Sequence, residues 1–133
     1  MHLMTHKILI LEDNTLLAML IEDMLETAGF DNHVLCRTEQ AALDFIAAEK
    51  PTFALLDFNL GDKKDSIKVA KALRDAAVPF FFLTGYAASL GIIPENLGAA
   101  KIINKPFKPA HLAKLIKQQL AVPQDSEKNC QCR

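Results

Sequence analysis

The chain has 133 residues, half of them hydrophobic, with 15 Lys and Arg and 16 Asp and Glu that leave a formal net charge of -1. This length and hydrophobic share predict one domain that folds alone, and the absence of a basic excess argues against nucleic-acid binding. No apolar run approaches the roughly 20 residues that span a bilayer, and the N-terminus lacks the long apolar segment of a signal peptide. We therefore expect a cytoplasmic protein that makes no membrane contact.

The three cysteines are an odd and poorly spaced set for a disulfide framework. Cys36 falls in a predicted strand, where we expect a small buried hydrophobe. Cys130 and Cys132 lie in a polar tail, 123–133, which we expect to be disordered beyond a domain that covers 1–122. The role of the two tail thiols stays open, because thiolates also bind soft metals.

The rest of the chain alternates short apolar runs with segments of helical periodicity, the pattern of an α/β fold with a parallel sheet. The apolar runs are continuous, as expected for strands covered on both faces. The predicted strands are 7–11, about 33–36, 53–56, 78–83 and 101–104.

Polar residues are placed to begin the helices between these strands. Asp13 or Asn14 can cap the first helix, and Thr38 the second. The third helix is predicted over about 66–76, and the last begins near Pro109, a residue that fits a first helical turn. Each segment also carries apolar residues at helical spacing.

The connection over 87–100 gives the weakest helix signal. It contains two glycines and a proline, which disfavour a helix interior. We expect a short or mobile helix there.

Polar side chains end or directly follow four of the predicted strands. Glu12 and Asp13 follow the first, Asp57 the third, Thr84 the fourth and Lys105 the fifth. In a parallel sheet wound by helices, the carboxyl ends of the strands converge on one crevice. Three carboxylates, a hydroxyl and an ammonium in one crevice predict a site for Mg²⁺ and a phosphoryl group.

The expected metal site follows from the ligands that Mg²⁺ prefers, which are carboxylates, waters and phosphate oxygens. Asp13 and Asp57 would supply carboxylates, Glu12 would orient a metal-bound water, and the backbone carbonyl of Asn59 would complete the set. Clustered carboxylates repel one another, so keeping all three ionised is costly until a cation arrives.

Asp57 is the predicted nucleophile, because it ends the central strand and carboxylates form aspartyl phosphates. Phosphoryl transfer needs mainly positioning and neutralisation of charge on the equatorial oxygens. The Lys105 ammonium and the Thr84 hydroxyl are placed to bind two of these oxygens.

These motifs, in this order, resemble the receiver domain of bacterial response regulators in two-component signalling. They are Ile8-Leu-Ile-Leu-Glu-Asp13, Leu55-Leu-Asp57, Phe82-Leu-Thr84-Gly and Lys105-Pro-Phe107. The resemblance covers roughly 7–120 and implies a doubly wound five-stranded α/β domain of flavodoxin-like order 2-1-3-4-5.

The resemblance also implies a function. Asp57 would be the phospho-acceptor, Thr84 the switch hydroxyl and Lys105 the invariant lysine of a phosphorylation-dependent switch that is not a turnover enzyme. The expected donor is a phosphohistidine on a sensor histidine kinase or a histidine phosphotransfer protein, and the output is binding to a downstream protein. In such domains the Lys105-Pro106 bond is commonly cis.

The chain departs from most receivers at one position. They carry Tyr or Phe three residues before the lysine, where this chain has Ile102. The fourth strand instead leads into Tyr86, in a pattern similar to receivers marked by a Phe-x-x-Thr-Gly-Tyr-like motif. Tyr86 either takes part in the switch or gates the acyl phosphate, or it is a surface tyrosine at a helix start.

Two other functions are weighed against this one. A Mg²⁺-dependent phosphohydrolase with an aspartyl-phosphate intermediate typically has a second aspartate two residues after the nucleophile as acid and base, and Asn59 occupies that place. A receiver-fold binding module that works without phosphorylation is the second alternative. Whether a phosphorylated chain acts as a regulator, a shuttle or a sink for phosphate is left open.

Overall fold

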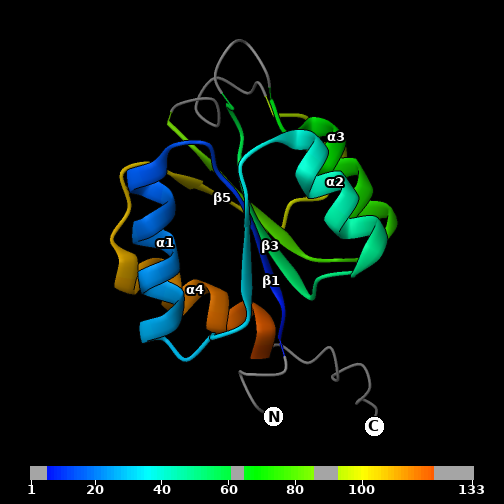
Figure 1. The fold of residues 1–133 in the computed structure, drawn as a ribbon. Helices are drawn as coiled ribbons and strands as arrows, with labels where there is room; N and C mark the ends of the chain where they lie inside the picture. The colour runs from blue at the N-terminus through cyan, green and yellow to red at the C-terminus, as the bar shows by residue number, and fades with distance from the viewer. Residues whose placement is uncertain (1–5, 61–64, 86–92, 122–133) are drawn as a thin grey trace, which may run out of the picture.

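The computed structural model describes residues 6–60, 65–85 and 93–121. Five parallel strands form one sheet in the order β2-β1-β3-β4-β5, which confirms the predicted strand order (Figure 1). The strands are β1 (Ile8–Leu11), β2 (His33–Cys36), β3 (Phe53–Asp57), β4 (Phe80–Thr84) and β5 (Lys101–Asn104). β3 therefore lies at the centre, and its last residue is Asp57.

Helices cover both faces of the sheet (Figure 1). One face carries α1 (Thr15–Thr27) and α4 (Pro109–Ala121), and the other carries α2 (Glu39–Ala48) and α3 (Ile67–Asp75). Within the described ranges, no helix is long and apolar enough to cross a membrane.

The helix starts follow the capping signals. Asn14, rather than Asp13, caps α1: its Oδ1 accepts a hydrogen bond from the Leu17 N–H at 2.9 Å. Thr38 caps α2 in the same way through the Ala41 N–H at 3.1 Å. Because Asn14 takes the capping role, the neighbouring Asp13 carboxylate is left for the crevice.

The strands alternate their side chains between two hydrophobic cores. In β1, Ile8 and Ile10 face the α1 and α4 side, whereas Leu9 and Leu11 face the α2 and α3 side. β3 and β4 follow the same alternation, and every residue of these three strands is buried. Packing on both faces holds the strand ends in place, and these ends carry the candidate site.

Two expectations are refined by the structure. β4 begins at Phe80 instead of residue 78, because Val78 and Pro79 lead into the strand. The described part of 87–100 contains a short 3-10 helix, η3 (Glu95–Leu97).

Tyr86 and the tail 123–133, with its two cysteines, lie outside the described residues. Cys36 is buried in β2 as predicted.

Helix α1 carries large apolar residues outside the core. Leu20 is 41% exposed although it has helical spacing to the core residues, and Leu16 and Met19 are exposed by 78% and 59%. The buried side of α1 consists of Ala18, Ile21, Met24 and Leu25. α1 therefore has an apolar stripe on its solvent side as well as on its core side.

Truncating a central core residue should destabilise the fold far more than the same truncation on the exposed stripe. Leu55→Ala should lower the free energy of unfolding by about 2 to 5 kcal/mol, because Leu55 is fully buried in β3. Leu16→Ala is the matched control and should change it by less than about 0.5 kcal/mol. Urea denaturation measures both, and equal losses would contradict the assignment of the core.

Candidate active site at the carboxyl ends of the strands

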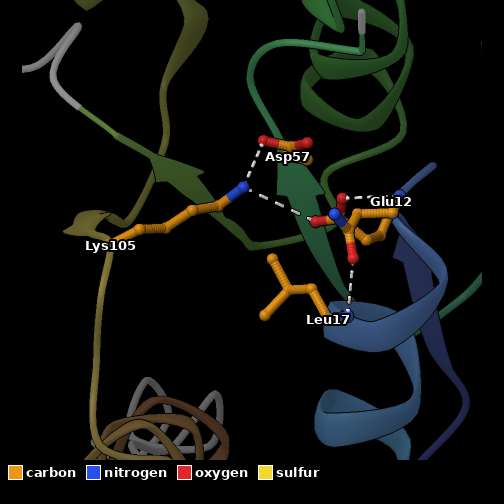
Figure 2. A network of polar contacts seen from close by, with 5 residues as sticks. Glu12, Leu17, Asp57 and Lys105 are labelled. Atoms are coloured by element: carbon orange, nitrogen blue, oxygen red, sulfur yellow. Dashed lines mark hydrogen bonds and ion pairs between the residues drawn. The ribbon is translucent and has the colours of Figure 1, made fainter.

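Glu12, Asp57 and Lys105, which come from β1, β3 and β5, meet at one edge of the sheet (Figure 2). Glu12 and Asp13 follow β1, Asp57 ends β3, and Lys105 follows β5. One oxygen from each of the three carboxylates lies within 4.8 Å of the others. Because the carboxyl ends of parallel strands converge, residues that are up to 93 positions apart in the sequence lie side by side here.

Lys105 provides the positive charge of this cluster. Its Nζ lies 2.9 Å from Asp57 Oδ1 and 3.7 Å from Glu12 Oε1 (Figure 2). The backbone N–H of Lys105 donates to the Thr84 carbonyl at 2.8 Å, which ties the end of β5 to the end of β4. The Lys105-Pro106 peptide bond is cis, as the resemblance implied.

Thr84 is the fully buried last residue of β4. Thr84 pairs with Asn104 of β5, and its neighbour Leu83 in β4 pairs with Asp57 of β3. Thr84 therefore lies at the same edge as the cluster, on the strand between Asp57 and Lys105.

Glu12 is the most deeply buried member, with 1% of its surface exposed. Its Oε2 accepts a hydrogen bond from the Asn14 N–H at 3.0 Å. Burial raises the pKa of Glu12 from 4.5 to about 7, and the nearby Asp57 carboxylate adds to the rise. Repulsion between the carboxylates was predicted from the sequence, but burial contributes more to the raised pKa of Glu12.

The donor set fits a hard divalent cation. All three groups are carboxylates, and Glu12 Oε1 is buried without a hydrogen bond from any described residue. Asp13 is the more open member at the rim, where water can complete a coordination shell. A cation would supply the charge that Lys105 alone does not.

Two further predicted residues are less defined. Asn59 is exposed and forms an isolated antiparallel bridge with Asp65, and the role of its carbonyl as a ligand stays a prediction. Tyr86 lies outside the described residues, so its part in a switch is likewise a prediction.

Arg37 is a neighbour of the cluster that the sequence reading missed. It follows β2 directly, and its Nη2 donates to the Asp13 carbonyl at 3.0 Å and to Thr15 Oγ1 at 2.7 Å. The signal was present, because Arg37 has the same position after a strand as the other site residues.

The fold and the site together define a class: a doubly wound α/β domain with an aspartate, an acidic pair and a lysine at the carboxyl edge of its sheet. The chain belongs to the response regulator receiver domain family, whose family model matches residues 8–117. The confirmed strand order is the flavodoxin-like order of this class.

Curated relatives agree with this assignment. The chain is 32% identical over 127 residues to the phyllosphere-induced regulator PhyR of Methylorubrum extorquens, covering 94% of this chain and 47% of PhyR. It is 31% identical over 134 residues to the alkaline phosphatase synthesis transcriptional regulatory protein PhoP of Bacillus subtilis, covering 95% and 55%. The chain thus spans about half the length of the curated relatives that it matches.

Solved structures show the same fold. A CheY-like response regulator receiver domain from Methanospirillum hungatei superposes with a TM-score of 0.78 at 28% identity, over 93% of this chain and 98% of that one. The receiver domain of PhyR from Erythrobacter litoralis gives a TM-score of 0.74 at 28% identity, over 88% and 91%.

The raised pKa of Glu12 predicts a pH dependence of stability in metal-free protein. Between pH 4.5 and about 7 the folded state keeps a proton that the unfolded chain releases, so the free energy of unfolding falls as pH rises. The contribution of this group is on the order of 3 kcal/mol across the interval. Glu12→Gln does not titrate and should lose this part of the slope.

Urea denaturation at pH 5 and pH 7.5, with a chelator present, measures the effect. The exposed Glu95 supplies the matched control, Glu95→Gln, which should keep the slope of the wild type. Identical slopes for Glu12→Gln and the wild type would contradict the assignment.

Proposed function

We propose that Asp57 accepts a phosphoryl group from a phosphohistidine on a sensor histidine kinase or a histidine phosphotransfer protein, in a Mg²⁺-dependent reaction. The observation that carries the proposal is the Lys105 ammonium 2.9 Å from Asp57 Oδ1, beside two further carboxylates. An ordinary structural ion pair does not need Glu12 and Asp13 against it. A phosphoryl acceptor does, because it must hold a cation and an anion together.

The proposed reaction breaks a P–N bond and forms a P–O bond. A carboxylate oxygen of Asp57 attacks phosphorus, and the electron pair of the P–N bond stays on the departing imidazole nitrogen. The backbone of Asp57 is held in place for this attack, because Asp57 ends a fully buried strand. Mg²⁺, when bound, would neutralise charge on the phosphoryl oxygens and on the carboxylates that hold it.

Lys105 and Thr84 are proposed to bind the phosphoryl group of the product. An acyl phosphate at Asp57 would add about 1.5 to 2 negative charges beside the Lys105 ammonium. The Thr84 hydroxyl would bind a phosphoryl oxygen from the neighbouring strand. The backbone N–H of Lys105 also donates a hydrogen bond to the Thr84 carbonyl. A movement of either residue would therefore displace the segment that links β5 to the start of α4.

The partners are proposed to be proteins. Three of the four large hydrophobic side chains that are exposed in the described part of the chain lie on α1, at Leu16, Met19 and Leu20. α1 begins two residues after Asp13, so this stripe borders the crevice through which a donor must approach Asp57. The formal net charge of -1 favours a protein over nucleic acid, and a cytoplasmic setting is part of the same proposal.

Beryllofluoride, an acyl-phosphate mimic, tests the phospho-switch directly. In labelled protein with Mg²⁺, it should shift the backbone amides of Thr84 and Lys105 saturably, because both residues would contact the mimic on Asp57. NMR spectra follow the titration. Asp57→Ala and omission of Mg²⁺ are the controls, and each should abolish the shifts.

A folded wild type that gives no shifts would contradict the proposal and favour the phosphorylation-independent binding module. Rapid hydrolysis of small phosphate esters with turnover would favour the phosphohydrolase instead.

The α1 stripe predicts a difference between protein and small-molecule donors. Met19→Glu should slow phosphorylation by a phosphohistidine protein about tenfold or more, because a charge on the apolar stripe opposes docking. The rate with a small acyl phosphate should not change, since that donor needs no docking surface. Phosphorylation time courses measure both rates.

The control is Ile102→Glu, which places the same charge on the remaining exposed large hydrophobic of the described chain, away from α1. An equal effect of the two variants on the protein donor, or a loss with the small donor, would contradict a docking role for α1.

A further inference from the structure

Arg37 joins the two loops that border the carboxylate cluster. It directly follows β2, and one nitrogen of its guanidinium, Nη2, donates to the Asp13 carbonyl at 3.0 Å and to Thr15 Oγ1 at 2.7 Å. These acceptors lie on either side of Asn14, the cap of α1. A single side chain thus spans the turn that carries Asp13 from a loop more than 20 residues away in the sequence.

The Asp13 carboxylate depends on this turn more than the other two carboxylates depend on theirs. Glu12 is buried and accepts a hydrogen bond from Asn14, and Asp57 is buried and bonded to Lys105. Within the described part of the chain, the Asp13 side chain has no hydrogen bond or ion pair, and it is the open member of the cluster. The backbone of Asp13 therefore sets the position from which its short side chain reaches the cluster and the rotamers open to it. Arg37 hydrogen-bonds the carbonyl of that backbone.

We propose that Arg37 is a positioning residue for the cation site, acting through the Asp13 carbonyl and the first residue of α1. The inference rests on the proposed function, because it assigns to the cluster the Mg²⁺ of that reaction. Mg²⁺ requires near-ideal octahedral geometry, so a misdirected ligand costs affinity. Groups that orient metal ligands typically change metal affinity or activity about 10- to 100-fold.

The positive charge of Arg37 by itself would weaken Mg²⁺ binding, whereas its positioning of Asp13 would strengthen Mg²⁺ binding. A substitution of Arg37 therefore distinguishes the two effects. A guanidinium repels a nearby cation, so a purely electrostatic role predicts tighter Mg²⁺ binding when Arg37 is removed. Arg37 is exposed, and salt screens an exposed charge at physiological ionic strength. Positioning therefore outweighs repulsion, and removal of Arg37 weakens Mg²⁺ binding.

The experiment titrates Mg²⁺ into the full chain and follows the backbone amides by NMR. Arg37→Ala should bind Mg²⁺ about tenfold more weakly than the wild type. Thr15→Val removes one acceptor without changing the charge and should give a smaller loss. Arg74→Ala is the matched control: Arg74 also donates to a backbone carbonyl, that of Asn96 at 3.1 Å, but away from the cluster, and its removal should leave Mg²⁺ affinity unchanged.

A second readout separates positioning from a general loss of structure. With a small acyl phosphate as donor, Arg37→Ala should need more Mg²⁺ for half-maximal phosphorylation of Asp57 but reach the rate of the wild type at saturation. A lower plateau with the Mg²⁺ dependence of the wild type would overturn the inference.

Unchanged or tighter Mg²⁺ binding by folded Arg37→Ala would overturn the inference and leave the proposed function intact. Should Arg37→Ala fail to fold, Thr15→Val decides, and wild-type Mg²⁺ affinity in that variant would overturn the inference. A wild type that binds no Mg²⁺ would overturn both the inference and the proposed function.

Discussion

Two buried carboxylates share one ammonium at the carboxyl edge of the sheet, and the organisation of the site follows from this imbalance. Lys105 lies 2.9 Å from Asp57 and 3.7 Å from Glu12, and both carboxyl groups are almost inaccessible to solvent. One cation cannot compensate two carboxylates that water does not reach. Burial raises the pKa of Glu12 to about 7, and the nearby Asp57 carboxylate adds to the rise. The metal-free site is therefore prepared for additional positive charge, which explains why cation and phosphoryl binding should be linked.

The fold is able to keep such an unfavourable cluster because the strands beneath it are rigid. β1, β3 and β4 are buried along their whole length between two hydrophobic cores, so the residues at their ends cannot easily move apart. A group held on packed strands keeps its geometry when charge is added or removed. The segments that directly follow the strands carry Asp13, Asn59 and Arg37.

Much of this arrangement was predictable from the sequence because it depends on a single geometric rule. Parallel strands end at one edge, so Glu12, Asp57 and Lys105 were expected to meet before any distance was known. Thr38 was recognisable as a cap, and the first cap as either Asp13 or Asn14, because helical apolar patterns follow these residues. Such rules concern the backbone and the periodicity of single elements.

Features that depend on three-dimensional packing were not predictable in this way. Leu20 has the helical spacing of a core residue, but the side of α1 on which it lies is not fully covered, and no periodicity reveals that. Burial of Glu12 as the main cause of its raised pKa needs the positions of its neighbours. The bonds of Arg37 need the positions of two loops that are distant in sequence.

Asp57 is the proposed phosphoryl acceptor, and mass spectrometry tests this role most directly. The chain would be incubated with a small acyl phosphate, with Mg²⁺ or with a chelator, and the product located by peptide mapping. We expect a mass increase of one phosphoryl group, confined to the peptide that contains Asp57 and absent when Mg²⁺ is chelated. A phosphoryl group on any other residue, or an unmodified chain at saturating donor and Mg²⁺, would contradict the role of Asp57.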